Sequence, residues 1–106
     1  MHVRIVTGNK DVYINSMEMK LEWDEEKRQA TLRERGLDFA DVARLDWDEA
    51  LTLEDERHAY PETRFLTFGR IGERLHVVAW CWRGTRMRVI SLRKANRREE
   101  ERYGRG

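Results

Sequence analysis

The spacing of hydrophobic and polar positions changes along the chain, from helical periodicity before residue 51 to strand-like alternation after it. Asp24 is a favourable N-cap for a helix over 25–35, and Gly36 stands where a left-handed C-terminal cap is expected. A second helix, capped by Asp38, is predicted to end near Leu45 or Trp47, with its apolar residues on one face. Both helices are short, so we expect them to bury their apolar faces against a sheet.

The second half of the chain is predicted to form consecutive strands joined by short turns. Apolar side chains alternate with polar ones, and glycine-containing turns separate the runs. The expected strands cover residues 51–53, 64–70, 75–82 and 87–92, and a charged helix follows over 94–103. Helices followed by a strand meander indicate one α+β domain, in which two N-terminal helices and a C-terminal helix pack on an antiparallel sheet.

Residues 1–16 differ in pattern from the rest of the chain. Alternation over 3–7, a Gly8-Asn9 turn and a second short run at 12–14 are typical of a hairpin. Two methionines just after this segment offer alternative start sites. We expect residues 1–16 to be an N-terminal extension, either a loose arm or a segment outside the main domain, and residues 17–106 to form that domain.

Charge is segregated along the chain, although the 106 residues carry a formal net charge of only +1. Residues 17–63 hold 7 basic and 15 acidic side chains, whereas residues 64–106 hold 12 basic and 4 acidic ones, and 11 of those 12 are arginine. Arginine makes bidentate contacts with phosphate and stacks on bases, so this bias favours a nucleic-acid ligand. The alternative is that the two halves interdigitate in the fold and neutralise each other.

Length and composition exclude several classes of protein. A chain of 106 residues builds one domain with a small core. No apolar run approaches the roughly 20 residues that cross a bilayer, and no N-terminal signal pattern is present. Cys81 is the only cysteine, so it cannot form an intrachain disulfide, and the three histidines lack zinc-ligand spacing. We therefore expect a soluble cytoplasmic domain with no metal, cofactor or membrane contact.

The side chains that can carry chemistry gather in two stretches, 55–64 and 86–98. Cleavage of RNA without a metal needs a base for the 2′-hydroxyl, an acid for the 5′-leaving oxygen, and cations for the charged phosphorane. Candidates for these catalytic roles are His58 or Glu62 as base, His58, Tyr60 or Lys94 as acid, and Arg64 and Arg93 as phosphate ligands.

Each candidate also has an ordinary structural explanation. A loop histidine such as His58 is more often solvated, and Tyr60 is a typical packed aromatic. Arg86 and Arg88 fit the solvent-facing side of a strand. The meander alone does not bring Arg64, at the start of one strand, to the arginine at position 93, at the end of another. Only the long loop before Arg64, or a C-terminal helix that folds back, could unite them.

A series of short motifs extends in order over most of the chain. It comprises Trp23-Asp24-x-x-Lys27, Arg33-x-x-Gly36, Phe39-x-x-Val42-Ala43, Asp55-x-Arg57, Tyr60-x-Glu62-x-Arg64, Gly69-Arg70-x-Gly72-x-Arg74-Leu75, Val77-Val78, Arg83-Gly84, Arg88-Val89-Ile90-Ser91 and Arg93-Lys94-Ala95-x-Arg97-Arg98-Glu99. In order and spacing this series resembles the BrnT family of bacterial type II toxins, over about residues 19–103. The resemblance implies a RelE-like ribonuclease fold and cleavage of mRNA that arrests translation.

The resemblance also implies partners. A BrnA-type antitoxin is expected to neutralise the toxin in a heterotetramer and to bind operator DNA, so that the toxin meets DNA only through its antitoxin. The free toxin is expected to form a homodimer. RNA, free or bound to the ribosome, is the other expected partner. The candidate RNA-binding residues are Lys27, Arg57, Tyr60, Arg86, Arg88 and Arg97.

The chain departs from the family pattern at three places. Thr31 stands where many relatives carry asparagine, Glu34-Arg35-Gly36 replaces Lys-His-Gly, and Pro61 replaces a glycine. An arginine cannot act as a general base at neutral pH, so Arg35 cannot replace a histidine in that role. Two alternatives to a ribonuclease therefore stay open: a module that binds RNA or antitoxin without cleavage, and a structural partner of an acidic protein.

Overall fold

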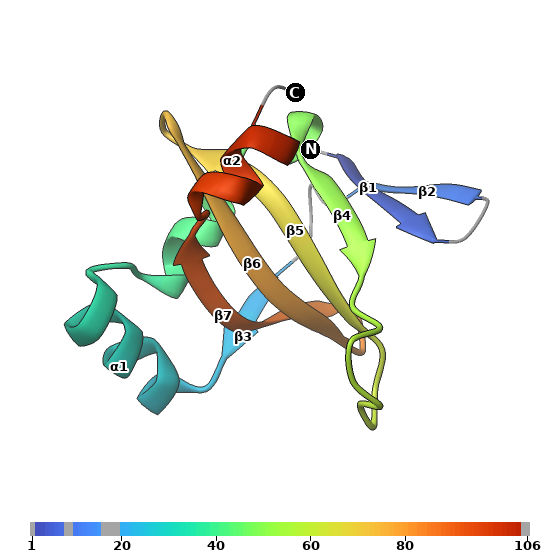
Figure 1. The fold of residues 1–106 in the computed structure, drawn as a ribbon. Helices are drawn as coiled ribbons and strands as arrows, with labels where there is room; N and C mark the ends of the chain where they lie inside the picture. Colours follow the sequence, from blue (N-terminus) through green and yellow to red (C-terminus); the bar gives the residue numbers. More distant parts are fainter. Residues whose placement is uncertain (1, 8–9, 16–19, 105–106) are drawn as a thin grey trace.

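Within the described chain, seven strands form one mixed sheet in the order β2-β1-β4-β5-β6-β7-β3 (Figure 1). The computed structural model describes residues 2–7, 10–15 and 20–104, with side chains described at residue 5 and over 20–104. The strands are β1 (His2–Thr7), β2 (Lys10–Asn15), β3 (Leu21–Trp23), β4 (Leu51–Glu54), β5 (Arg64–Ile71), β6 (Arg74–Arg83) and β7 (Arg86–Lys94). The α-helices are α1 (Glu25–Arg35) and α2 (Arg97–Tyr103), and 3-10 helices cover Phe39–Arg44 and Trp47–Glu49.

The predicted meander is confirmed, because β4, β5, β6 and β7 are antiparallel neighbours in chain order. The prediction of a purely antiparallel sheet is wrong, since β1 pairs with β4, and β3 with β7, in parallel. The N-terminal hairpin strands are present as β1 and β2. The predicted Gly8-Asn9 turn and the methionines at 17 and 19 lie outside the described residues.

Both ends of α1 form as the sequence predicts. Asp24 Oδ1 accepts hydrogen bonds from the backbone N–H groups of Glu26 at 2.9 Å and Lys27 at 3.3 Å. These contacts satisfy two of the donors that the first helical turn leaves unpaired. Gly36 ends the helix at a φ of 67°, a left-handed conformation that residues with a side chain rarely adopt.

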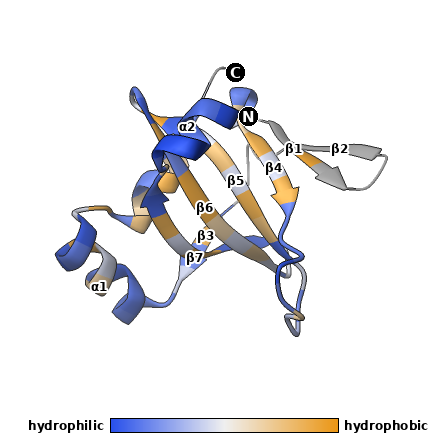
Figure 2. Cartoon of the chain, in the orientation of Figure 1, coloured by the Kyte–Doolittle hydropathy of each residue, from blue (hydrophilic) through white to orange (hydrophobic). Residues whose placement is uncertain are grey.

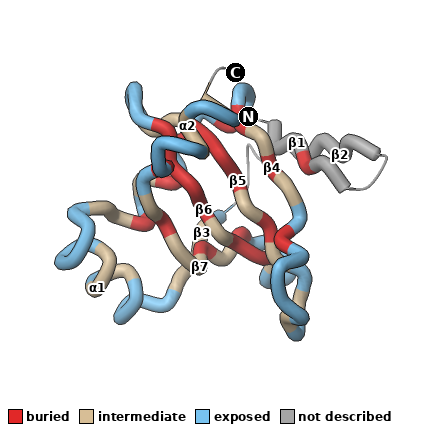
Figure 3. The backbone as a smooth tube through the Cα atoms, in the orientation of Figure 1, coloured by how far each residue is buried: buried red, intermediate tan, exposed pale blue. Residues whose placement is uncertain are grey.

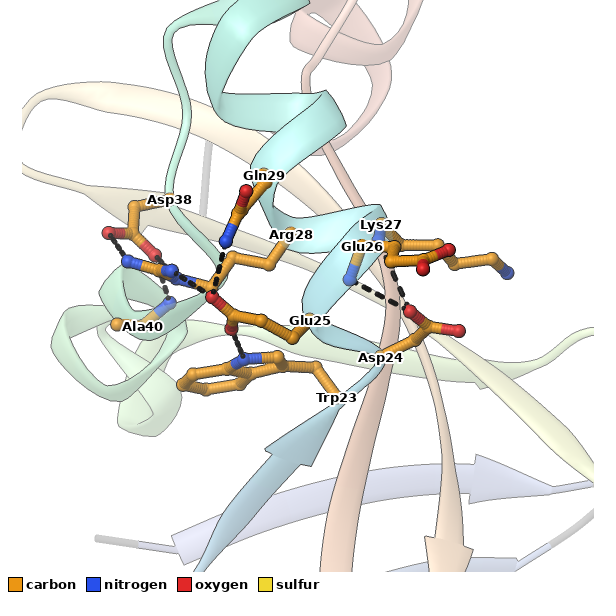
Figure 4. Close-up of polar contacts among 9 residues, drawn as sticks. All are labelled: Trp23, Asp24, Glu25, Glu26, Lys27, Arg28, Gln29, Asp38 and Ala40. Atoms are coloured by element: carbon orange, nitrogen blue, oxygen red, sulfur yellow. Dashed lines mark hydrogen bonds and ion pairs between the residues drawn. The ribbon is translucent and has the colours of Figure 1, made fainter.

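The predicted packing of α1 is wrong, because none of its residues is buried (Figure 3). Its sequence offers one alanine and one leucine as apolar residues, too few for a continuous stripe. Polar contacts hold it instead (Figure 4). The Arg28 guanidinium donates to both carboxylate oxygens of Asp38 at 2.8 and 3.1 Å, and Trp23 Nε1 donates to Glu25 at 3.0 Å.

The second predicted helix is a 3-10 helix over Phe39–Arg44 rather than an α-helix. Asp38 caps it as expected by accepting from the backbone N–H of Ala40 at 2.9 Å. Side chains three residues apart eclipse in a 3-10 helix. Phe39 and Val42 are three residues apart and both buried, so they pack side by side against the sheet. These six residues therefore cover part of the core, and packing supplies the stability that an isolated helix of that length lacks.

The main core lies between the 3-10 helices and one face of the sheet. Trp80 is fully buried there, with its ring centroid 4.7 Å from that of Phe65 and 6.5 Å from that of Trp47. The indole Nε1 donates to Thr67 Oγ1 at 2.8 Å, and that hydroxyl shares a 2.7 Å hydrogen bond with Thr52 Oγ1. Three buried polar groups therefore satisfy one another inside an apolar core.

A smaller core lies on the other face, under α2. Tyr103 stacks on Phe68 with ring centroids 4.1 Å apart. The helix begins later than the predicted residue 94, because β7 continues to Lys94 and Asn96 forms a capping box with Glu99. Figure 2 shows the apolar residues on the strands and hydrophilic ones on α1, α2 and the loop after β4.

No helix of the described chain is long and apolar enough to cross a membrane.

We expect Thr67→Val to lower the free energy of unfolding by about 1–3 kcal/mol. The substitution keeps the side-chain volume but leaves the Trp80 N–H and the Thr52 hydroxyl buried without their partner. Urea unfolding followed by tryptophan fluorescence measures the change. Thr63→Val in the exposed loop before β5 is the control, and equal stability of the two variants would contradict this role of Thr67.

Candidate functional site

Arginines gather on the sheet face opposite the main core, which we call the arginine face. Residues paired across strands point to the same side of a sheet, so the register defines rows of side chains. The first row comprises Glu22, Arg88, Cys81 and Arg64, the second Ser91, Ala79 and Leu66, and the third Arg93, Val77 and Phe68. The second row is half-buried, which leaves an open strip between the arginines of the first and third rows.

The same register shows how Arg64 and Arg93 are related. They share the arginine face, two rows apart, on strands separated by β6. The meander does not join them, as the sequence indicated. The charge of Arg57, in the loop after β4, slightly lowers the pKa of Arg93 and of its partner Glu99, but no hydrogen bond or ion pair joins that loop to Arg93 among the described residues. The C-terminal helix contacts Arg93 through Glu99, and the loop contacts Arg64 through Tyr60, so each arginine meets a different one of the two segments.

A buried carboxylate organises the loop after β4. Asp55 is 6% exposed, and its backbone N–H donates to the carbonyl oxygen of Arg64 at 2.7 Å. Arg57 donates to the two carboxylate oxygens of Asp55 from Nε at 2.8 Å and from Nη2 at 2.9 Å, and the Tyr60 hydroxyl donates to Oδ2 at 3.1 Å. The hydrogen bonds from Arg57 hold the pKa of Asp55 at about 2 and raise the pKa of Arg57.

Arg64 lies against this loop. Its guanidinium carbon is 4.2 Å from the centroid of the Tyr60 ring, a cation–π contact. Its Nε is 3.5 Å from Glu62 Oε1, and this buried nitrogen has no hydrogen-bond partner among the described residues. A buried N–H donor without an acceptor is unusual in a folded protein. The Arg64 side chain as a whole is 29% exposed, so an anion can approach the guanidinium from its exposed side.

His58 and Glu62 line one hollow in the same loop. Its volume is about 330 Å³, and its wall comprises Glu54, Asp55, Glu56, His58, Ala59, Tyr60, Pro61, Glu62 and Thr63. The exposed His58 ring meets the Tyr60 ring edge-on, with centroids 5.6 Å apart. The two candidate bases and the stacked Tyr60–Arg64 pair therefore lie in one short segment.

Arg93 is held by the C-terminal helix. Its two terminal nitrogens donate to the two carboxylate oxygens of Glu99 at 2.7 and 2.8 Å. These hydrogen bonds raise the pKa of Arg93 and lower that of Glu99. Lys94 follows Arg93 in β7 but pairs with His76, in the row of the opposite face. The register therefore separates Lys94 from the other catalytic candidates.

The remaining RNA-binding candidates are spread along the molecule. Arg86 and Arg88 are alternate residues of β7, on the arginine face, and Arg88 lies 3.5 Å from Glu22. Arg97 is exposed in the first turn of α2. Lys27 is exposed on α1, where Figure 4 shows it pointing away from the contacts of Arg28.

Sequence reasoning missed the carboxylates that hold the cations, Asp55 and Glu99. The signal for the first was present, because Asp55-x-Arg57 is a short local motif that precedes Tyr60. The burial that gives the carboxylate its importance depends on how the loop folds over the sheet. Arg35, a departure from the family pattern, donates to the carbonyl oxygen of Leu92 at 2.9 Å and ties the end of α1 to β7.

An α+β domain with arginines along one sheet face, beside a loop rich in proton-transfer groups, defines a class of proteins suited to a polyanion. The particular family follows from comparison with known proteins. The model of the family described as "Ribonuclease toxin, BrnT, of type II toxin-antitoxin system" matches residues 23–99. The chain belongs to the BrnT family of ribonuclease toxins, and a type II toxin implies a cognate antitoxin as partner. No curated protein and no solved structure matches the chain.

We expect Asp55 to contribute stability that depends on pH. Its folded-state pKa of about 2 lies below the ordinary 3.8, so the contribution is complete above pH 4 and is lost as the pH falls through 2. It amounts to about 2 kcal/mol or less, because the exposed Arg57 side chain is screened by solvent. Urea unfolding between pH 2 and 6 should show a flatter profile for Asp55→Asn than for wild type. The exposed Glu34→Gln is the control, and parallel profiles for Asp55→Asn and wild type would refute the assignment.

Proposed function

We propose that the protein is a metal-independent endoribonuclease that cleaves mRNA and thereby arrests translation. The observation that carries this proposal is the Arg64 guanidinium, which lies 4.2 Å from the ring of Tyr60, a residue that lines the same hollow as His58 and Glu62. Membership of a ribonuclease toxin family supports the reaction class.

The loop supplies the groups that RNA cleavage requires. Glu62 or His58 takes the proton of the 2′-hydroxyl, which attacks the adjacent phosphorus, and a protonated His58 can return a proton to the 5′-leaving oxygen. Arg64 stabilises the charge that develops on the phosphorane. Tyr60 is a weaker candidate for the acid because its hydroxyl already donates to Asp55. Lys94 is weaker still because it lies in the row of the opposite sheet face.

The arginine face gives the RNA backbone a path away from the loop. Arg88 shares the row of Arg64, and Arg86 lies two residues along the same strand. An RNA backbone that crosses the half-buried second row meets Arg93. If Arg93 releases Glu99 and binds a phosphate instead, the contact between RNA and the arginine face becomes longer. Arg57, Arg97 and Lys27 are outer contacts in this proposal, and Tyr60 offers its ring to a base.

The finer features of the family are part of the same proposal. The α+β sheet with a C-terminal helix supports a RelE-like fold. We infer a domain over 17–106 with an N-terminal addition, since the family match begins at residue 23. A BrnA-type antitoxin would neutralise the toxin in a heterotetramer and carry the contact with operator DNA.

A second function, binding of RNA without cleavage, is favoured by one observation. The cations of the site already have carboxylate partners, Glu62 for Arg64 and Glu99 for Arg93. In this second function Glu62 and Glu99 hold the phosphate-binding arginines in place, and Glu62 does not act as a base. The two functions differ in whether new RNA ends appear.

We expect induced expression of the wild-type chain in a bacterial host to stop growth and to generate new RNA 5′ ends. Arg64→Ala and His58→Ala should each relieve the arrest, because the first removes the phosphate ligand and the second a proton-transfer group. Mapping of RNA ends and growth curves at matched protein levels measure the effect. Arg44→Ala, on the 3-10 helix of the other face, removes an exposed arginine without touching the site.

Each result of this experiment has a defined meaning. Arrest with new ends, lost in both site variants and kept in Arg44→Ala, supports the ribonuclease. Normal growth with intact RNA and stable protein favours the binding module. Wild-type toxicity of Arg64→Ala and His58→Ala removes those positions from the site. Cleavage by the purified protein in the presence of EDTA tests independence from metal.

We expect RNA affinity to fall steeply with salt, and Arg88→Ala to reduce the slope of log K against log salt by about 0.7. That is the counterion release of one phosphate contact to a single strand. The ligand is 2′-O-methyl RNA, which lacks the attacking hydroxyl and is not consumed. Fluorescence anisotropy at several salt concentrations gives the slope. A loss of the same size in Arg44→Ala would show that the contact is not specific to the arginine face.

A further inference from the structure

The carboxylate of Asp55 is saturated by the loop that follows it. Oδ1 accepts from Arg57 Nε at 2.8 Å and from the Arg57 backbone N–H at 3.2 Å. Oδ2 accepts from Arg57 Nη2 at 2.9 Å and from the Tyr60 hydroxyl at 3.1 Å. The Asp55 side chain is 3% exposed, so these four contacts replace its water.

One of these four contacts, together with a backbone hydrogen bond of Asp55, fixes the groups around Arg64. The bond to Tyr60 sets the position of its ring, and that ring carries the Arg64 guanidinium at 4.2 Å. Arg64 Nε has no hydrogen-bond partner among the described residues, so the ring and the ion pair with Glu62 orient the guanidinium. The backbone bond from Asp55 to the Arg64 carbonyl fixes the same residue from its other end.

We propose that Asp55 is a positioning residue of the cleavage site, which sets the Arg64 guanidinium through the ring of Tyr60. The inference rests on the proposed ribonuclease function. The carboxylate of Asp55 is occupied by hydrogen bonds from Arg57 and Tyr60, so it acts on the site through Tyr60 rather than by contact with substrate. A buried carboxylate thus fixes the direction in which the arginine at the start of β5 meets a phosphate.

The sign of the effect separates positioning from simple electrostatics. A carboxylate beside an RNA site repels phosphate, so removal of its charge should strengthen RNA binding if charge were its only role. A positioning role predicts the opposite for the chemical step, because a misplaced guanidinium loses its contact in the transition state. Asp55→Asn should therefore leave RNA binding equal or tighter while it slows cleavage.

The test is a double-mutant cycle on single-turnover cleavage of a labelled RNA. We expect Asp55→Asn to slow the rate at saturating protein 10–100-fold, with RNA half-saturation unchanged or lower. In the Arg64→Ala background the same substitution should change the rate less than about twofold, because the group it orients is gone. Tyr60→Phe, which keeps the ring but loses the bond to Asp55, should lie between wild type and Asp55→Asn.

A matched control comes from Asp38, which accepts a bidentate pair of hydrogen bonds from Arg28 of α1, as Asp55 does from Arg57. Asp38→Asn breaks a comparable pair far along the chain from the loop and should leave the cleavage rate unchanged at temperatures below its unfolding. A rate loss of the same size in both variants would show a general loss of structure and overturn the proposal. Independent, multiplicative effects of Asp55→Asn and Arg64→Ala would overturn it as well.

A second measurement does not depend on cleavage. In ¹⁵N-labelled protein, the Arg64 Nε–H resonance should be displaced by the Tyr60 ring current. It should move toward the value of an exposed arginine in Asp55→Asn and in Tyr60→Leu, but not in Asp38→Asn. If the wild-type chain cleaves no RNA, the proposed function fails while this resonance still decides the placement of Arg64. An Arg64 signal unmoved in Asp55→Asn would refute the positioning role.

Discussion

One sheet has two faces to bury, and the residues outside its strands cover only one of them well. The two 3-10 helices place Phe39, Val42 and Trp47 over Trp80 and close that face. On the other face, α2 has seven residues and covers only the end near Phe68 and Leu75. The arginines of β5 and β7 border the strip that α2 leaves uncovered, and this is the surface on which function is proposed.

The elements that could be predicted were those with local causes. Asp24 and Gly36 define α1 because capping depends on a few adjacent residues, and the strands follow from alternation that the sheet preserves. The α-helix expected after Asp38 failed because tertiary packing of Phe39 and Val42 selected the tighter 3-10 geometry. The parallel pairing of β3 with β7 joins residues more than 60 positions apart, and nothing local indicates it.

The site was predictable in its residues but not in its arrangement. The stretch 55–64 stood out because acids, bases, an aromatic and arginines lie close in sequence. Only the register shows that Arg64 and Arg93 share a face while Lys94 does not. The segregation of charge along the sequence is likewise only partly preserved in the fold. Asp55 pairs with Arg57, and Glu99 with Arg93, so each half of the chain neutralises some of its own charge. Arg88 and Glu22 form a pair between the halves.

The unburied helix α1 has a consequence for how this protein can diverge. A core helix is constrained at every position that packs, since each change of volume is felt in stability. α1 contributes no buried side chain and is anchored by Arg28, Trp23 and Arg35. Substitution at its other positions should change the free energy of unfolding little, and this includes Leu32, an exposed large apolar residue. A residue retained among related chains at one of these exposed positions would therefore point to a contact with another molecule, because the fold does not require it.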